Sequence, residues 1–143
     1  MAYLLYRDSG IQVGDIVNMG TLSDLPEDIL EAYNAPFPDE SYKEGARIFP
    51  SLVPISPEDP AAQANREAWE VLSRFKKPFL TAFSDGDPIT RGGEQIFQKR
   101  VHGAKGQPHT IIKGGGHFLQ EDRGEAFAEA VIDFIIKTSS MDT

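Results

Sequence analysis

The sequence predicts an α/β fold with an incomplete sheet. Two short apolar runs, at 79–83 and 110–112, have the length and the flanking proline and turn residues of buried strands. Each run is followed by an amphipathic helical pattern, at 94–101 and at 123–137. This order of strand, helix, strand and helix is typical of a right-handed parallel crossover. Because sheets usually have about four to six strands and parallel sheets are covered on both faces, the pattern predicts that further strands are missing.

The N-terminal half is predicted to be irregular and helical. Its seven prolines break the chain into short pieces, because proline does not fit inside a helix. Short helices are expected at 27–33 and 41–49, with Ser41 as the N-cap of the second. A longer helix is expected at 61–75, where apolar residues recur at helical spacing. This change in character predicts a division of the chain near residue 77.

Composition and charge disfavour several classes of function. The 143 residues carry a net charge of −8, which disfavours nucleic acid and anionic membranes as partners. The absence of cysteine excludes disulfides and thiolate zinc sites. No apolar run approaches the length of about 20 residues that spans a membrane, and the run at 2–6 is too short for the core of a signal peptide. We therefore expect a cytoplasmic protein with no metal and no cofactor.

Two residues that suit acid–base chemistry follow the two predicted strands. Asp87 lies in the turn after the first strand, and His117 follows the glycine loop after the second. If the strands are parallel neighbours, both residues emerge at the carboxyl edge of the sheet, where open α/β sheets bind ligands. A carboxylate beside an imidazole fixes the ring's tautomer and stabilises its charged form. The placement predicts the acid and base of a catalytic triad.

Other interpretations of these residues stay open. Aspartate before proline is a common turn signal, so Asp87 could be structural. Asp85 is the alternative acid, although it lies nearer the end of the strand and earlier in the turn. His102 and His109 are expected on the surface.

Three segments resemble haloalkane dehalogenases. The sequence Tyr-Asn-Ala-Pro-Phe-Pro-Asp-Glu-Ser-Tyr-Lys-Glu-Gly-Ala-Arg at 33–47 is similar to their cap domain, and it is the most specific of the three. The sequence at 83–90 is similar to the segment that bears their catalytic acid, and that at 114–121 to the segment that bears their base. The last two segments are also similar to those of epoxide hydrolases and other α/β-hydrolases. The resemblance extends from about Gly14 to Lys137.

The resemblance implies a partial α/β-hydrolase fold. Residues 1–76 would form a helical cap region and its connecting helix, and residues 77–143 would form the last strand-helix-strand-helix of the core, with the acid and base loops. The earlier strands of the usual sheet would lie before Met1.

The resemblance also implies hydrolysis of carbon–halogen bonds in small haloalkanes. The family uses an aspartate to displace halide and form an ester, and a histidine then activates the water that hydrolyses the ester. Carried onto this sequence, His117 would be the base and Asp87 the acid that orients it. The nucleophile and the tryptophan that follows it have no counterpart here. Tyr6 aligns with a halide-binding tryptophan of the cap, and Trp69 is expected to serve in packing.

A chain without a nucleophile is expected to be inactive alone. No Gly-x-Ser-x-Gly elbow is present, and no aspartate or serine lies in a sharp turn between a strand and a helix before Asp87. A small haloalkane would be the substrate if an N-terminal half completed the site, and self-association is expected. The alternatives are another α/β-hydrolase, such as an epoxide hydrolase, and a remnant with no catalytic activity.

Overall fold

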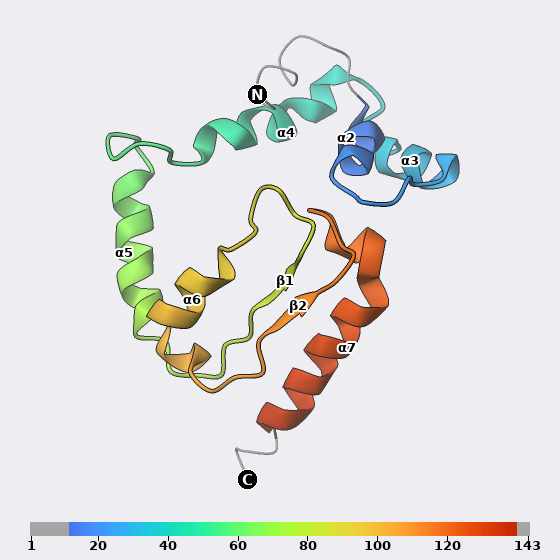
Figure 1. Cartoon of the computed structure of the whole chain (residues 1–143). Helices are drawn as coiled ribbons and strands as arrows, with labels where there is room; N and C mark the ends of the chain where they lie inside the picture. The colour runs from blue at the N-terminus through green and yellow to red at the C-terminus, as the bar shows by residue number, and fades with distance from the viewer. Residues whose placement is uncertain (1–11, 140–143) are drawn as a thin grey trace. The chain divides into compact units, whose positions relative to one another are not determined.

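The protein is described by a computed structural model for residues 12–139, and the chain forms two compact units (Figure 1). Of the described residues, 12–19 and Asp24–Trp69 form the first unit, and Gly20–Ser23 and 70–139 form the second. The boundary therefore falls inside helix α5, Ala62–Ser73.

The first unit consists of short helices. Helices α2, Val13–Met19, and α3, Glu27–Asn34, pack against each other. Their approach requires glycine at position 14, because a Cβ there would lie 2.5 Å from the carbonyl oxygen of Leu30. The Asn34 side chain also accepts a hydrogen bond of 2.9 Å from the Gly14 amide, which ties the end of one helix to the start of the other.

The single helix predicted at 41–49 is wrong. This region forms three short helices, η1 Glu40–Lys43, α4 Glu44–Ile48 and η2 Phe49–Leu52. The N-cap is not Ser41 but Asp39, whose carboxylate accepts a hydrogen bond of 2.9 Å from the Ser41 amide. Both residue types cap helices, and the choice between them depends on where the extended backbone ends. That point is Asp39, with φ −149° and ψ 177°.

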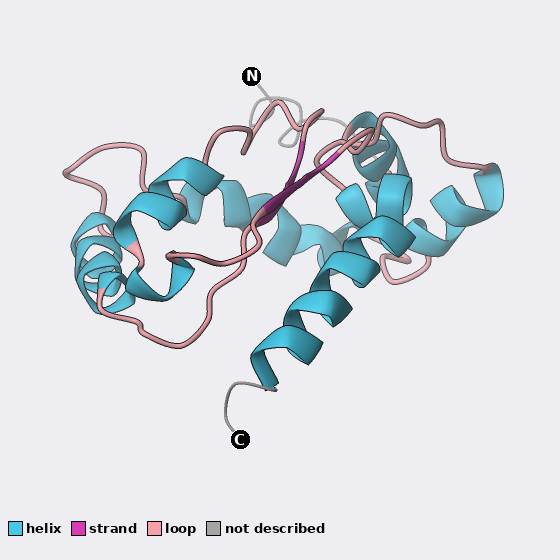
Figure 2. Cartoon of the chain, turned by 60° about the horizontal axis from the view of Figure 1, so that its bottom comes forward, coloured by secondary structure: helices cyan, strands magenta, loops and turns pink. Residues whose placement is uncertain are grey.

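The second unit contains the predicted parallel strands, and the α/β prediction is confirmed. Strand β1, Ala82–Ser84, pairs with β2, Thr110–Ile112, in parallel and with Ala82 opposite Thr110 (Figure 2). Strand β1 is shorter than the predicted run at 79–83. At the start of the predicted run, the Phe79 amide donates to the Gly103 carbonyl at 3.0 Å, so this amide does not pair with β2.

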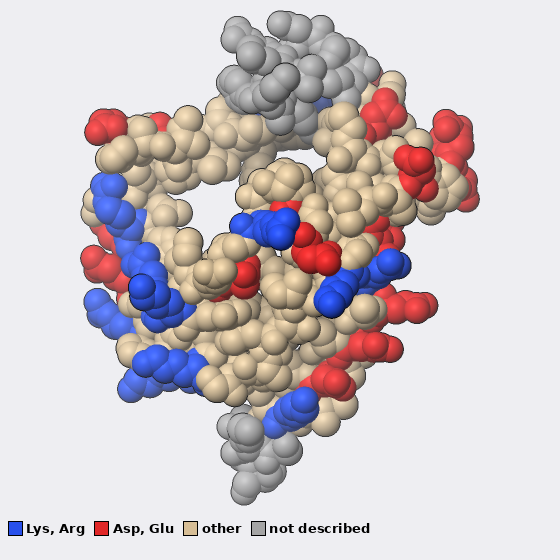
Figure 3. All heavy atoms as spheres, viewed as in Figure 1, with Lys and Arg blue, Asp and Glu red and all other residues tan. Residues whose placement is uncertain are grey.

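Helices connect and follow the two strands. Helix α6, Glu94–Arg100, lies in the crossover, and α7, Leu119–Ser139, follows β2. Helix α7 begins four residues before the predicted Arg123, which itself has non-helical angles of φ −144° and ψ 41°. Figure 3 shows acidic side chains along the exposed side of α7. None of the helices in the described part of the chain is both long and apolar enough to cross a membrane.

His109 is not the surface residue that the sequence predicts. Its ring is half-buried, Nδ1 accepts a hydrogen bond of 3.1 Å from the Thr81 amide, and Nε2 lies 2.7 Å from the carbonyl oxygen of Ala104. Because an amide can only donate to Nδ1, Nε2 is the ring nitrogen that can donate to the Ala104 carbonyl. His109 thus joins the start of β1 to the loop before β2. His102 is exposed, as predicted.

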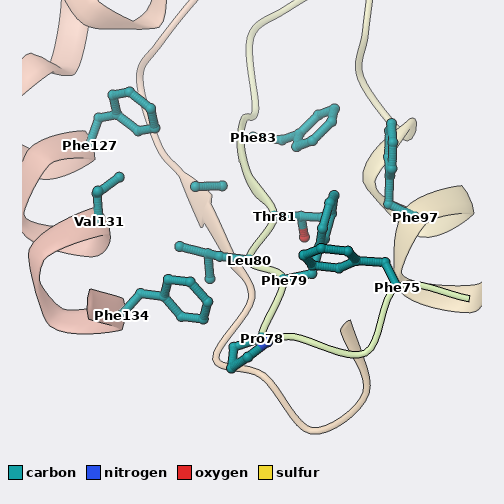
Figure 4. Close-up of a pocket in the computed structure, with 11 residues that line it drawn as sticks. Phe75, Pro78, Phe79, Leu80, Thr81, Phe83, Phe97, Phe127, Val131 and Phe134 are labelled. Carbon is teal, nitrogen blue, oxygen red and sulfur yellow. The ribbon is translucent and has the colours of Figure 1, made fainter. Parts of the chain in front are cut away.

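The apolar core is small for a chain of this length. The buried apolar side chains of the described residues are Val17, Ala62, Val101, Ala104, Ile112 and Leu119. An open apolar cavity of about 550 Å³ lies along β1, between Phe79, Phe83 and Phe97 on one side and Phe127, Val131 and Phe134 of α7 on the other (Figure 4). Within the described residues, β1 has β2 as its only strand partner, so one edge of β1 is unpaired.

Candidate active site

The two strand ends bring Asp87 and His117 together. Strand β1 ends at Ser84 and β2 ends opposite it at Ile112, so the turns that follow leave the same edge of the sheet. The Nδ1 atom of His117 lies 3.1 Å from Oδ2 of Asp87. The predicted meeting of the two side chains is therefore present in the structure.

Asp87 is held as an ionised carboxylate. Its side chain is almost fully buried, with 5% of it exposed. Burial raises the pKa of Asp87, but hydrogen bonds from the Thr90 hydroxyl, the Ile89 amide and the His117 ring outweigh this effect and lower the pKa from 3.8 to about 2. The amide of Ile89 donates to Oδ1 at 2.7 Å, and the hydroxyl of Thr90 donates to Oδ2. Asp87 therefore carries its negative charge at any pH above about 3.

His117 presents one ring nitrogen to the carboxylate and leaves the other available. Because the carboxylate of Asp87 can only accept, Nδ1 carries the proton of the neutral ring. Among the described residues, no hydrogen-bond partner is found for Nε2, and a third of the side chain is exposed. The ring also meets Phe118 edge-on, with centroids 5.3 Å apart. A base with one oriented and one free nitrogen can take a proton from water or from a nucleophile.

The alternative acid, Asp85, has a different set of contacts. Its Oδ1 accepts a hydrogen bond of 2.8 Å from the Gly114 amide, and its own amide donates to the Ile112 carbonyl at 3.2 Å. Asp85 thus holds the turn after β1 to the glycine loop after β2. The pairing with the His117 ring is made by Asp87.

A small cavity of about 170 Å³ lies at the pair, lined by Ser84 and Leu119 among other residues. The buried hydroxyl of Ser84 donates to the Gly116 carbonyl at 2.8 Å, so its proton is used in holding the glycine loop. Within the described chain, no residue is hydrogen-bonded to Nε2 as a nucleophile, and no group of three or more acidic or histidine side chains is placed to hold a metal. Tyr6 lies outside the described residues.

Sequence reasoning missed the residues that support the pair. Thr90 follows Asp87 at a spacing at which its hydroxyl can reach the carboxylate, and the Asp-Pro-x-Thr sequence could have indicated such a turn. Asp122, a few residues after His117, and Gly20, far from it in the sequence, accept hydrogen bonds from the backbone around His117. No local pattern indicates those contacts.

The fold defines the class of protein. The structure matches a crystal structure of DbjA with a TM-score of 0.77 and 21% identity, over 97% of this chain and 46% of that chain. DbjA is an α/β-hydrolase, so the fold of the present chain is part of an α/β-hydrolase fold.

Curated relatives match the chain more closely in sequence, although no family model matches it. A haloalkane dehalogenase of Psychrobacter cryohalolentis is 58% identical over 123 residues, and one of Mycobacterium marinum is 47% identical over 124 residues. Haloalkane dehalogenase 1 of Mycobacterium tuberculosis is 48% identical over 124 residues. The chain is thus homologous to the C-terminal part of haloalkane dehalogenases. These matches cover 86–87% of this chain but 41% of each relative.

Proposed function

We propose that this chain carries the general base and the orienting acid of a haloalkane dehalogenase, with His117 as the base and Asp87 as the acid. The observation that carries the proposal is the contact of 3.1 Å between His117 Nδ1 and Asp87 Oδ2 at the carboxyl edge of the sheet. The relatives that share this part of the chain are haloalkane dehalogenases, which supports a small haloalkane as the substrate.

The geometry supports a defined role for each of the two residues. Asp87, ionised at neutral pH, holds the Nδ1 proton of His117, so the lone pair on Nε2 points away from the carboxylate. In the family's reaction an aspartate displaces halide and becomes an alkyl ester. Nε2 would then accept a proton from water as that water attacks the ester, and Asp87 would stabilise the positive imidazolium. The nucleophile would be supplied by sequence corresponding to the rest of the relatives' length.

A hybrid enzyme tests the proposal. This chain would replace the homologous C-terminal part of the Psychrobacter cryohalolentis dehalogenase, and steady-state halide release from 1-bromobutane would be measured. His117→Ala should abolish continuous turnover, and Asp87→Asn should slow it by at least about a hundredfold, since removing a group from acid–base catalysis costs about 10²–10⁴-fold. His102→Ala is the matched control, because His102 is exposed. Equal loss of activity in the His102 and His117 variants would contradict the assigned roles.

Other statements about the whole protein stay proposals. Self-association of the chain is supported by the unpaired edge of β1 and by the open apolar cavity beside it. Location in the cytoplasm stays a prediction from the sequence.

A further inference from the structure

We infer that Asp122 is a positioning residue that holds the backbone of His117 in place by joining the His117 loop to the segment Gly20–Ser23. This inference rests on the proposed function insofar as His117 is the base. The role is geometric, and it follows from hydrogen bonds that Asp122 accepts from the amide of Gly116, 6 positions away, and from the amide of Leu22, 100 positions away in the sequence.

The Asp122 carboxylate collects hydrogen bonds from both segments. Oδ2 accepts from the Gly116 amide at 2.7 Å and from the Leu22 amide at 2.9 Å. Oδ1 accepts from the Ser23 amide at 2.9 Å and from the Ser23 hydroxyl at 2.6 Å. One side chain in the first turn of α7 therefore satisfies backbone donors on two loops at once.

The segment Gly20–Ser23 in turn contacts His117 directly. The carbonyl of Gly20 accepts from the His117 amide at 2.7 Å and from the Phe118 amide at 3.1 Å. A Cβ at position 116 would lie 2.5 Å from that same carbonyl oxygen, so glycine at 116 is required for this approach. The segment also belongs to the compact unit of His117 rather than to that of its neighbours in sequence.

Hydrogen bonds consequently hold both the amide and the carbonyl of Gly116. Its amide donates to Asp122, and its carbonyl accepts from the buried Ser84 hydroxyl at 2.8 Å. Burial raises the pKa of Asp122, but hydrogen bonds from the Ser23 hydroxyl and from the amides of Leu22, Gly116 and Ser23 lower it from 3.8 to about 2. The carboxylate is therefore ionised at neutral pH and accepts at both oxygens. The orientation of His117 toward Asp87 depends on this arrangement.

Asp122→Asn is the sharpest test of the arrangement. Each carboxylate oxygen accepts from at least two donors, so either orientation of the asparagine amide places an NH₂ group against backbone N–H groups. Asp59→Asn is the matched control. Asp59 also accepts from two backbone amides, those of Ile55 and Ser56, each at 2.6 Å, but it does so in a turn of the first unit.

The measurement is NMR of the ¹⁵N-labelled chain. In Asp122→Asn, amide exchange at Gly116, His117 and Phe118 should be at least about tenfold faster, since a hydrogen bond to a charged group contributes about 1.5–3 kcal/mol. The ¹⁵N shifts of the His117 ring, which report the proton on Nδ1, should also change, and a purely structural role elsewhere would not move them. Asp59→Asn should leave both readouts as they are in the parent chain.

Ser23→Ala is the milder second variant, and it removes only the hydroxyl that donates to Oδ1. It should give a smaller change of the same kind, and it decides the matter if Asp122→Asn does not fold. The inference would be overturned if a folded Asp122→Asn variant had the amide exchange and ring ¹⁵N shifts of the parent chain. If Asp122→Asn is unfolded, the same result in Ser23→Ala would overturn it. Neither readout requires dehalogenation, so this inference and the proposed function can fail separately.

Discussion

The hydroxyl of Thr90 should lower the pKa of Asp87, and Thr90→Val tests this. The replacement keeps the shape of the side chain but removes the donor to Oδ2, which is the strongest of the hydrogen bonds that lower the pKa of Asp87. A hydrogen bond to a charged group contributes about 1.5–3 kcal/mol, and about 1.4 kcal/mol corresponds to one pKa unit. We therefore expect the pKa of Asp87 to rise from about 2 by about one unit or more.

The sign of the effect on stability follows from the same numbers. A carboxyl whose pKa is lower in the folded chain stabilises the fold above its unfolded pKa, and this stabilisation is lost as the pH falls through the folded value. For Asp87 the loss falls between pH 3.8 and about 2 and amounts to about 2 kcal/mol. In Thr90→Val the loss should be smaller and complete at a higher pH.

The assay is a titration of the Asp87 carboxyl carbon by ¹³C NMR between about pH 1 and about pH 6, where the limits are about one unit or more beyond the expected midpoints. Thr138→Val is the control, because the Thr138 hydroxyl donates to the Phe134 carbonyl on α7, away from Asp87. A pKa of Asp87 that is the same in the parent chain and in Thr90→Val would refute the reasoning. So would an equal rise in the control variant.

Three further predictions concern the chain by itself. First, halide release from 1,2-dibromoethane should equal the rate without protein, because no described residue meets Nε2 of His117 as a nucleophile; multiple turnovers abolished by His117→Ala would contradict this. Second, the chain should self-associate or bind a hydrophobic dye through the apolar cavity, and Phe127→Glu should reduce both effects. A monodisperse monomer with a sharp thermal transition and no dye binding would contradict this. Third, His109→Ala should lower the urea concentration at the midpoint of unfolding, because it removes the hydrogen bonds to Thr81 and Ala104. His102→Ala should not, because His102 is exposed. Equal midpoints in both variants would contradict the structural role of His109.

The site could be predicted from the sequence where it depends on strand ends. Asp87 and His117 follow two apolar runs at similar distances, and parallel pairing alone then brings them to one edge. Position in the turn favours Asp87 over Asp85, and the structure pairs Asp87 with the histidine ring. The strand-helix-strand-helix order can likewise be predicted, because the strands are short apolar runs and the helices have apolar residues at helical spacing.

Other features depend on contacts that no local pattern encodes. The sequence predicts His109 on the surface, because a lone histidine near a proline gives no sign that Thr81 and Ala104 lie on either side of its ring. The bonds that Asp122 accepts from Leu22 and Ser23 join residues 100 and 99 positions apart. Asp39 and Ser41 are both good N-caps, and the extended backbone at Asp39, which decides between them, cannot be told from the two residue types alone.

The most direct test of His117 as the base is the intact mass of the hybrid enzyme after exposure to 1-bromobutane. If His117 activates the water that hydrolyses the ester, the His117→Ala hybrid should still displace halide, because an aspartate nucleophile needs no base to attack. It should release a single equivalent of bromide and accumulate a covalent butyl adduct, while the parent hybrid should show no lasting adduct. A His117→Ala hybrid that turns over at the parent rate, with no adduct in its mass spectrum, would contradict the assignment of His117 as the base.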